Sequence, residues 1–159
     1  TDKHFSYILN FSSTSFIDKI VLDKAWQAVT TPRGGKLSLS VYSAMEASGI
    51  IYKIDNDSIR TDILDLYQNW YEKYHNVIDY DLIHIQKMDD IILKNFILLT
   101  DNKSWNLDWS IDSNIKEMLS NNELRNYIAA NRGTKSIMKG RANKLIERIQ
   151  NAISLIDKF

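Results

Sequence analysis

The side chains that could take part in catalysis begin with three histidines, His4, His75 and His84. None of them forms a His-x3-His or His-Glu-x-x-His pattern, the spacings that place two imidazoles on one helix face around zinc. His75, Asn76 and His84 occur in the order of an HNH nuclease, but that motif needs a ββα framework and a far wider spacing. The chain has no cysteine, which excludes disulfides, thiolate metal sites and a cysteine nucleophile. These residues predict neither a zinc hydrolase nor a thiol enzyme.

A short glycine-containing loop and two acid pairs are the other candidates for chemistry. Gly34–Lys36 can offer backbone N–H groups and one cation to a phosphate ahead of a helix, or it can be a plain loop. The pairs Asp79/Asp81 and Asp89/Asp90 can hold a divalent cation or remain solvated charges, and we favour solvated charges. No pattern places a serine, a histidine and an acid together. The sequence therefore favours a protein that is not an enzyme and that uses no cofactor or metal.

Positive charge is concentrated in the last third of the chain, although the total charge is zero with 20 basic and 20 acidic residues. From Arg125 to Arg148, seven basic residues accompany one acid, Glu147, so this window carries +6 and the other 135 residues carry −6. Such asymmetry is typical of a surface that faces nucleic acid, or of the solvated flank of a packed helix. The basic residues of the window are Arg125, Arg132, Lys135, Lys139, Arg141, Lys144 and Arg148.

The elements that must position these side chains are mostly helices. The first is predicted within Phe11–Thr31, with Ser13 or Ser15 as its cap, and Thr31–Gly35 ends it. Lys36–Gly49 is ambiguous, but Leu37, Val41, Ala44, Met45 and Ser48 share one helical face. We therefore predict a helix there, with Gly49 as the residue just past its end.

The middle of the chain predicts one strand and one strong helix. Ile50–Ile54 is rich in β-branched residues and is predicted to be a short strand. A helix capped by Asp57 or Ser58 follows, because apolar residues recur close to every 3.6 positions. Val77–Asn95 is mixed, and we predict a loop or short strand and then a short helix at Met88–Leu93. The repeating apolar positions are Ile59, Ile63, Leu66, Trp70 and Tyr74.

A β-hairpin is predicted from Phe96 to Trp109, because two apolar runs flank an Asp-Asn-Lys turn. Trp105, Leu107 and Trp109 alternate with polar residues, as in a half-buried strand. The hairpin either closes the core or acts as a wing with Lys103 at its tip. A helix, a short strand, a helix and then a hairpin fit a winged-helix-like unit. The predicted fold class is α+β, mostly helical, with a winged-helix-like core, a β-hairpin and a long C-terminal helix.

One or two further helices are predicted to end at Gly133, and Thr134–Phe159 is predicted to be a long terminal helix. Its apolar residues step by 4, 3, 4, 3 and 4, which is heptad spacing. The stripe either packs on the core of its own chain or pairs with a second copy. We therefore divide the chain into a helical, winged-helix-like domain, 1–133, and a C-terminal helix, 134–159, that packs on it or mediates association. The stripe is Met138, Ala142, Leu145, Ile149, Ala152 and Ile156.

Three stretches together resemble a known family. A Pro-Arg-Gly-Gly-Lys loop, 32–36, precedes an apolar helix, the strand–turn–helix pattern of 49–75 follows, and Phe96–Leu107 has the spacing Phe-x-x-Leu-x5-Trp-x-Leu. This order is similar to the N-terminal DNA-recognition domains, sulfur-binding modules and their relatives, of HNH-type modification-dependent restriction endonucleases. The resemblance implies that Pro32, Arg33 and Lys36 lie near the DNA backbone.

The resemblance also implies that Phe96, Leu99, Trp105 and Leu107 form the hairpin and its core. Two glycines interrupt the first motif, and its second proline is absent. Asn95 stands where the family has the proline of its sulfur-binding pocket. No HNH nuclease half follows in these 159 residues, so cleavage is not implied.

Two functions are consistent with these patterns. The first is a non-catalytic DNA-binding module of a prokaryotic restriction or defence system, which contacts the phosphate backbone and a modified site. The second is a protein–protein interaction module, such as an antitoxin, immunity or phage accessory protein, which uses its heptad helix to form a homodimer or to bind a partner. The expected DNA contacts are Arg33, Lys36, Lys103, Arg132, Lys135, Lys139 and Arg141.

The sequence gives no sign of a membrane protein. Its apolar runs are far shorter than the roughly 20 residues that span a bilayer. The N-terminus lacks the basic region and long apolar core of a signal peptide. We therefore expect a cytoplasmic protein without a membrane partner.

Overall fold

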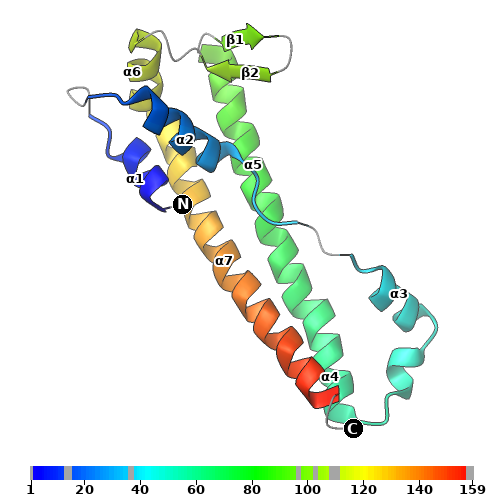
Figure 1. The fold of residues 1–159 in the computed structure, drawn as a ribbon. Helices are drawn as coiled ribbons and strands as arrows, with labels where there is room; N and C mark the ends of the chain where they lie inside the picture. Colours follow the sequence, from blue (N-terminus) through cyan, green and yellow to red (C-terminus); the bar gives the residue numbers. More distant parts are fainter. Residues whose placement is uncertain are drawn as a thin grey trace. The chain divides into compact units, whose positions relative to one another are not determined.

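The computed structural model describes residues 2–12, 16–35, 38–95, 98–101, 104–107 and 112–156, most of them in helices (Figure 1). Within these residues, no helix combines the length and the apolar character needed to cross a membrane. The elements in chain order are α1 (Asp2–Leu9), α2 (Lys19–Thr30), α3 (Ser40–Ala47), the 3-10 helix η1 (Ile50–Lys53), α4 (Asp57–Asp65), the π-helix η2 (Leu66–Tyr71), α5 (Glu72–Asn95), β1 (Leu98–Asp101), β2 (Ser104–Leu107), α6 (Asp112–Ser120) and α7 (Asn122–Ile156).

The chain divides into two compact units. The first unit comprises Thr1–Pro32 and Tyr80–Thr134, and the second comprises Arg33–Asp79 and Lys135–Phe159. The long helices α5 and α7 each contribute to both units. The predicted division of the chain into a domain, 1–133, and a C-terminal helix, 134–159, stays a prediction.

The first unit has an apolar core built from α1, α2, α6 and parts of α5 and α7. The sequence pattern did not reveal α1, which contributes Phe5 and Ile8 to this core. α2 begins after Asp18, whose Oδ1 accepts hydrogen bonds from the backbone N–H groups of Ile20 and Val21 at 3.0 and 3.1 Å. The predicted caps, Ser13 and Ser15, lie outside the described residues.

The prediction of a loop or short strand after Val77 is wrong, because Val77 lies inside the 24-residue helix α5. Buried residues follow at helical spacing along this stretch, but one of them is an acid, Asp81, which is fully buried. An acid at a core position interrupts the apolar periodicity on which a helix prediction depends. The buried face of α5 consists of Val77, Ile78, Asp81, Ile85, Met88, Ile91 and Ile92.

In the second unit, the predicted helix before Gly49 is present as α3, and Gly49 has φ 71°, as expected just past a helix end. The helical face that supported this prediction is not the buried one, because Val41 is 71% exposed and Tyr42 is buried instead. The predicted strand Ile50–Ile54 is also wrong, because Ile50–Lys53 forms η1. β-Branched composition favours a strand only where a neighbouring strand pairs with it, and the chain instead turns tightly after Gly49.

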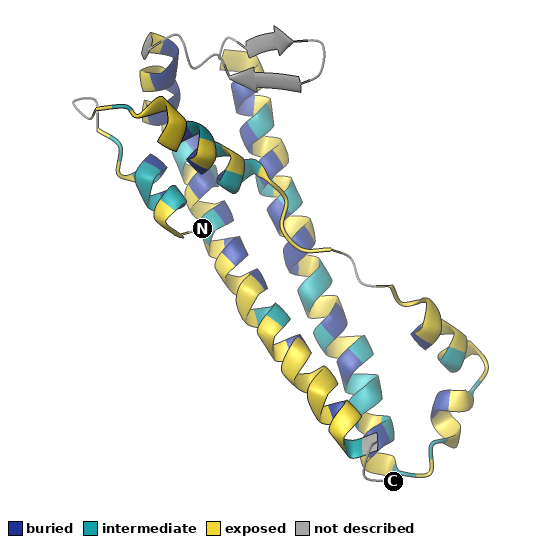
Figure 2. Cartoon of the chain, in the orientation of Figure 1, coloured by how far each residue is buried: buried dark blue, intermediate teal, exposed yellow. Residues whose placement is uncertain are grey.

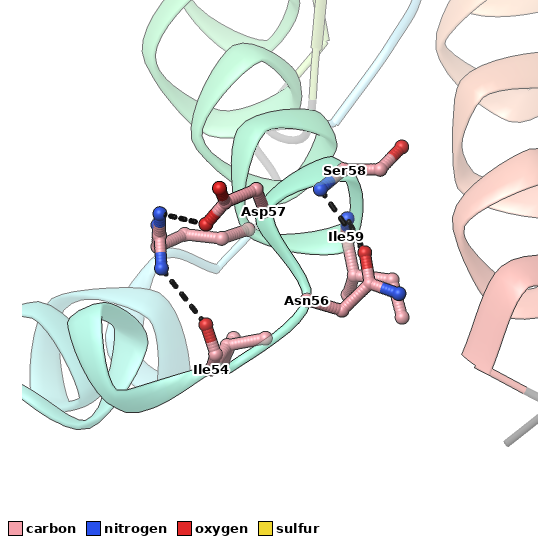
Figure 3. Close-up of polar contacts among 6 residues, drawn as sticks. Ile54, Asn56, Asp57, Ser58 and Ile59 are labelled. Carbon is pink, nitrogen blue, oxygen red and sulfur yellow. Dashed lines mark hydrogen bonds and ion pairs between the residues drawn. The ribbon is translucent and has the colours of Figure 1, made fainter.

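α4 begins one residue earlier than predicted, since Asn56 is its cap rather than Asp57 or Ser58. Oδ1 of Asn56 accepts hydrogen bonds from the N–H groups of Ser58 at 3.0 Å and Ile59 at 3.2 Å (Figure 3). The Arg60 side chain pairs with Asp57 and also donates to the carbonyl oxygen of Ile54 at 2.9 Å. These contacts fix the direction in which the chain enters the long helical segment.

α4, η2 and α5 follow one another without an intervening loop. η2 is a π-helix of six residues, Leu66–Tyr71. π-Helical turns are rare and occur frequently at functional sites, because they contain an extra residue and redirect side chains. In this protein the turn carries Tyr67, Gln68 and Trp70.

The 35-residue helix α7 passes through Gly133 without a break, so the predicted helix end at Gly133 is wrong. A Cβ atom at Gly133 or Gly140 would meet nothing within 4 Å, so neither glycine is required for close packing. Met138, Leu145 and Ala152 of the heptad stripe are buried, whereas solvent-exposed residues predominate on the later turns of α7 (Figure 2). Burial of these three residues within the second unit explains part of the heptad pattern without a second copy, Ile149 of the stripe is exposed, and homodimerisation stays a prediction.

Strands β1 and β2 pair in antiparallel fashion, with Leu98 opposite Leu107 and Asp101 opposite Ser104. They supply four residues each, and in the described part of the chain they pair only with each other. The predicted α+β class with a winged-helix-like core is therefore wrong, because the architecture is helical and no strand among the described residues before α4 joins this pair. Lys103, the expected wing tip, lies outside the described residues.

Candidate functional site

The most distinctive group of functional side chains surrounds Trp70 in the second unit. The indole is fixed by Asp65 at the end of α4, since Nε1 of Trp70 donates to Oδ2 of Asp65 at 3.1 Å. The other carboxylate oxygen, Oδ1, accepts from Nδ2 of Asn69 at 2.8 Å. Both acceptor positions of the carboxylate are therefore used to hold the π-helix and its tryptophan in place.

Three cations gather at this half-buried indole. Nζ of Lys73 lies 5.1 Å from the ring centroid, Nζ of Lys144 lies 5.7 Å from it and Cζ of Arg148 lies 5.6 Å from it. Lys73 comes from α5, and the other two come from consecutive turns of α7. The electron-rich ring face attracts cations at such distances, with roughly 0.5–1 kcal/mol for each exposed pair. All three side chains are exposed to solvent.

A fourth cation, Arg141, is anchored beside this group, because its guanidinium donates to the backbone carbonyl of Lys73. We call Lys73, Arg141, Lys144 and Arg148 the cation cluster. Nη1 of Arg148 lies 3.9 Å from Oδ2 of Asp65, a long ion pair. The four cations outnumber this carboxylate. Like charges held together repel one another, and a bound anion would relieve that repulsion.

Of the predicted DNA contacts, the structure brings Arg141 into this cluster. Arg33 is exposed in the second unit, and Lys36 and Lys103 lie outside the described residues. Arg132 belongs to the first unit, where its Nε pairs with Oδ1 of Asp2 at 2.7 Å. The predicted set therefore does not form one described surface.

Lys135 and Lys139 lie on the other flank of α7 from Arg141. Successive helix residues turn by about 100°, so Lys139 is rotated by about 160° relative to Arg141. Lys135 is buried with 8% of its surface exposed, whereas Lys139 is exposed. These two residues cannot join Arg141, Lys144 and Arg148 on one face.

Arg125, another cation of the basic window, has a structural role in the first unit. Its guanidinium donates to the carbonyl oxygens of Leu119 at 3.0 Å and Phe11 at 3.5 Å, and also to that of Leu9. Leu9 and Leu119 lie in the last turns of α1 and α6, and Phe11 lies just past α1, where backbone acceptors lack helical partners. The positive charge of Arg125 therefore caps two helix ends.

Sequence reasoning missed Trp70 and Lys73 as site residues. Trp70 was assigned to the apolar face of its helix, because it fits the spacing from Leu66 to Tyr74. A usable signal was the i, i+3 pair Trp70–Lys73, which places a cation over an indole on one helix face. The partners from α7 are far away in sequence, and only the folded second unit brings them to Trp70.

The glycine loop is explained by packing. Gly34 has φ 91°, and a Cβ atom there would lie 3.0 Å from Sδ of Met138 and 3.0 Å from the Tyr74 hydroxyl. A side chain at this position is disfavoured both by the positive φ and by the close contacts. The plain-loop interpretation accounts for Gly34, and the cation expected beside it, Lys36, lies outside the described residues.

Several of the candidate catalytic residues have structural partners. His84 Nδ1 lies 3.2 Å from the Thr134 hydroxyl, and His75 stacks on Tyr71 with ring centroids 4.2 Å apart. Asp81 accepts a hydrogen bond from Asn131. In the described part of the chain, no three His, Asp or Glu side chains are grouped so that they could hold a metal ion.

Two ionisable groups have raised pKa values. Burial raises the pKa of the Asp89 carboxyl, and the neighbouring charge of Asp90 adds to the effect. Burial also raises the pKa of the Tyr42 hydroxyl, and the Glu46 charge acts in the same direction. The hydrogen bond that Gln68 donates to the Tyr42 oxygen acts in the opposite direction.

Comparison of the chain with protein-family models, curated proteins and solved structures found no match.

Proposed function

We propose that this protein binds the phosphate backbone of DNA through the cation cluster. The observation that carries the proposal is the convergence of Lys73, Lys144 and Arg148 on one indole, with Arg141 anchored beside them. The cations lie on two helix segments. This arrangement fits a ligand with a row of phosphates better than a ligand with a single carboxylate. Phosphate contacts of this kind supply affinity and orientation without reading bases.

The cluster is pre-organised for such contacts. The hydrogen bond from Trp70 to Asp65 fixes the ring, and the ring holds the cations near one another before any ligand arrives. Less side-chain entropy is then lost on binding than with freely rotating lysines. Recognition of a modified site and a role in restriction or defence stay predictions, because Lys36, Phe96 and Lys103 of the family-like motifs lie outside the described residues.

The proposal is tested by fluorescence anisotropy with a labelled DNA duplex between about 50 and 200 mM salt. Neutralising four phosphates predicts a slope of log K against log salt of about −3 to −4. The double variant Lys144→Gln/Arg148→Gln is expected to reduce that slope to about −2 and to weaken binding at every salt concentration. Circular dichroism verifies that the variant retains its helices.

The matched control is Lys139→Gln, which removes one exposed positive charge from the other flank of α7. This variant should bind as the parent does, apart from a small effect of the changed net charge. Absence of binding at the lowest salt concentration, or equal losses in Lys139→Gln and Lys144→Gln, would exclude the cation cluster as the DNA contact.

Protein–protein association is a second candidate, and exposed apolar residues on α7 favour it. Ile146, Ile149 and Ile153 are 54%, 36% and 53% exposed and are separated by three and four residues, as in a helix-pairing seam. If a second copy covers this seam, sedimentation velocity will show a dimer that Ile149→Lys converts to a monomer. A parent protein that remains monomeric across the accessible concentration range would exclude self-association.

A further inference from the structure

A groove of about 450 Å³ opens in the second unit beside the π-helix. No member of the cation cluster lines it, so the inference below does not depend on the proposed DNA contact. Tyr67 and Gln68 come from η2, Glu72 and His75 come from the first turns of α5, and Leu39 precedes α3. The lining residues are Leu39, Tyr67, Gln68, Tyr71, Glu72 and His75.

The wall of the groove is part of a continuous ladder of aromatic rings. Tyr42 and Tyr67 stack with centroids 4.3 Å apart and planes 15° apart. Tyr67 and Tyr71 follow at 6.2 Å, and Tyr71 and His75 stack at 4.2 Å with planes 24° apart. The ring faces of such a ladder that remain uncovered offer electron-rich surface to a planar or cationic group.

Two of the polar groups that line the groove, Gln68 and Glu72, offer acceptors. Nε2 of Gln68 donates to the Tyr42 hydroxyl at 3.2 Å. The amide oxygen of Gln68 can therefore accept a hydrogen bond from a ligand in the groove. Glu72 is exposed and adds a carboxylate to the lining. Among the described lining residues there is no lysine or arginine. The charge of the groove is therefore complementary to a cation.

We propose that this groove binds an arginine side chain of a partner polypeptide. The guanidinium stacks against the tyrosine ladder, its N–H groups donate to the Glu72 carboxylate and the Gln68 amide oxygen, and its aliphatic stem contacts Leu39. A guanidinium is preferred over an ammonium because it is planar, weakly hydrated and able to stack while donating several hydrogen bonds in its plane. The groove would thus be a binding site for a basic peptide segment. It lies beside α5, the helix that also carries Lys73 of the cation cluster.

The test uses the full-length protein labelled with ¹⁵N and titrated with blocked arginine, N-acetyl-arginine amide. Saturable shifts of the Tyr67, Tyr71 and His75 amide signals are expected in the millimolar range, because one side chain makes all the contacts. Blocked citrulline, which has nearly the same shape and no charge, should produce no saturable shift. The variant Glu72→Gln should weaken arginine binding about tenfold, since a charge-assisted hydrogen bond is lost.

The matched control is Asp62→Asn, which removes one carboxylate from α4 in the same unit without altering the groove lining. It should bind arginine as the parent does, and the spectra verify that both variants are folded. Absence of saturable shifts, equal binding of citrulline, equal binding of blocked lysine, or unchanged affinity in Glu72→Gln would each overturn the proposal. Basic peptides can then be compared with single residues to measure the contribution of neighbouring side chains.

Discussion

Nδ2 of Asn131 donates a hydrogen bond to Oδ1 of Asp81 over 2.7 Å, and both side chains are fully buried. This bond joins α5 to α7 inside the first unit. Oδ1 of Asn131 is buried without a hydrogen-bond partner among the described residues. A polar pair in an apolar helix interface contributes little net stability while paired, and removing one partner is costly.

Asn131→Leu is expected to lower the free energy of unfolding by about 3 kcal/mol, because the fully buried Asp81 side chain loses a hydrogen-bond donor. The double variant Asp81→Leu/Asn131→Leu should be more stable than the sum of its single variants predicts. Urea denaturation measures both effects. The control is Asn126→Leu, at an exposed position of the same helix, and equal losses at positions 126 and 131 would contradict a role for the buried pair.

Gly34→Ala should destabilise the protein by about 2 kcal/mol, because φ 91° is unfavourable for alanine and the new methyl group meets Met138 and Tyr74. Gly35→Ala is the neighbouring control, where a Cβ atom meets nothing within 4 Å. Thermal unfolding should show a clear loss for Gly34→Ala and little change for Gly35→Ala. A similar melting temperature in both variants would mean that the loop does not pack in this way.

Leu145→Ala and Ile146→Ala test which face of α7 packs into the second unit. Leu145 is buried, so its truncation should cost about 3 kcal/mol of unfolding free energy. Ile146 is exposed, so its truncation should change that free energy by less than about 0.5 kcal/mol. Chemical denaturation of the two variants at low protein concentration makes the comparison. The reverse order would show that the heptad stripe faces a partner instead of the chain's own core.

The raised pKa of Asp89 predicts a specific pH dependence of stability. The folded state holds the Asp89 proton more tightly than the unfolded state does. The stability that this proton adds to the folded state is therefore fully present below the ordinary carboxyl pKa near 4. It is lost as pH rises from that value through the raised folded pKa. Asp89→Asn should therefore be more stable than the parent at neutral pH and should lack this loss.

Asp90→Asn is the companion variant for that measurement. It removes the smaller cause of the Asp89 shift and leaves the burial of Asp89 in place. Urea midpoints measured across the acidic range should retain most of the pH dependence in Asp90→Asn. A parent protein whose stability increases steadily over the same range, with no difference in Asp89→Asn, would contradict the assignment.

The sequence predicted local features well where one residue type controls them. Gly49 has the left-handed conformation expected just past a helix end, and the apolar repeat from Ile59 indicated the helical segment that begins with α4. The prediction failed where tertiary contacts override local preference. The buried Asp81 obscured α5, and Ile50–Lys53 found no strand partner despite its β-branched composition.

The candidate site was less predictable than the fold. The net charge of the Arg125–Arg148 window indicated a basic region. It could not show that the basic residues of this window have three different structural roles. Arg125 caps helix ends, Lys135 is buried, and Lys144 lies over an indole. Only the arrangement of the helix faces separates these uses.

The π-helix η2 makes this part of the chain sensitive to its length. Its wide turn holds one residue more than an α-helical turn within nearly the same rotation, so α4 and the first turns of α5 keep almost the phase of one regular helix. Deletion of one residue from Leu66–Tyr71 would therefore restore regular winding without turning α4, but it would redirect the side chains of the turn itself. Among homologues, we expect the length of this segment to be kept wherever Tyr67, Gln68 and Trp70 are kept.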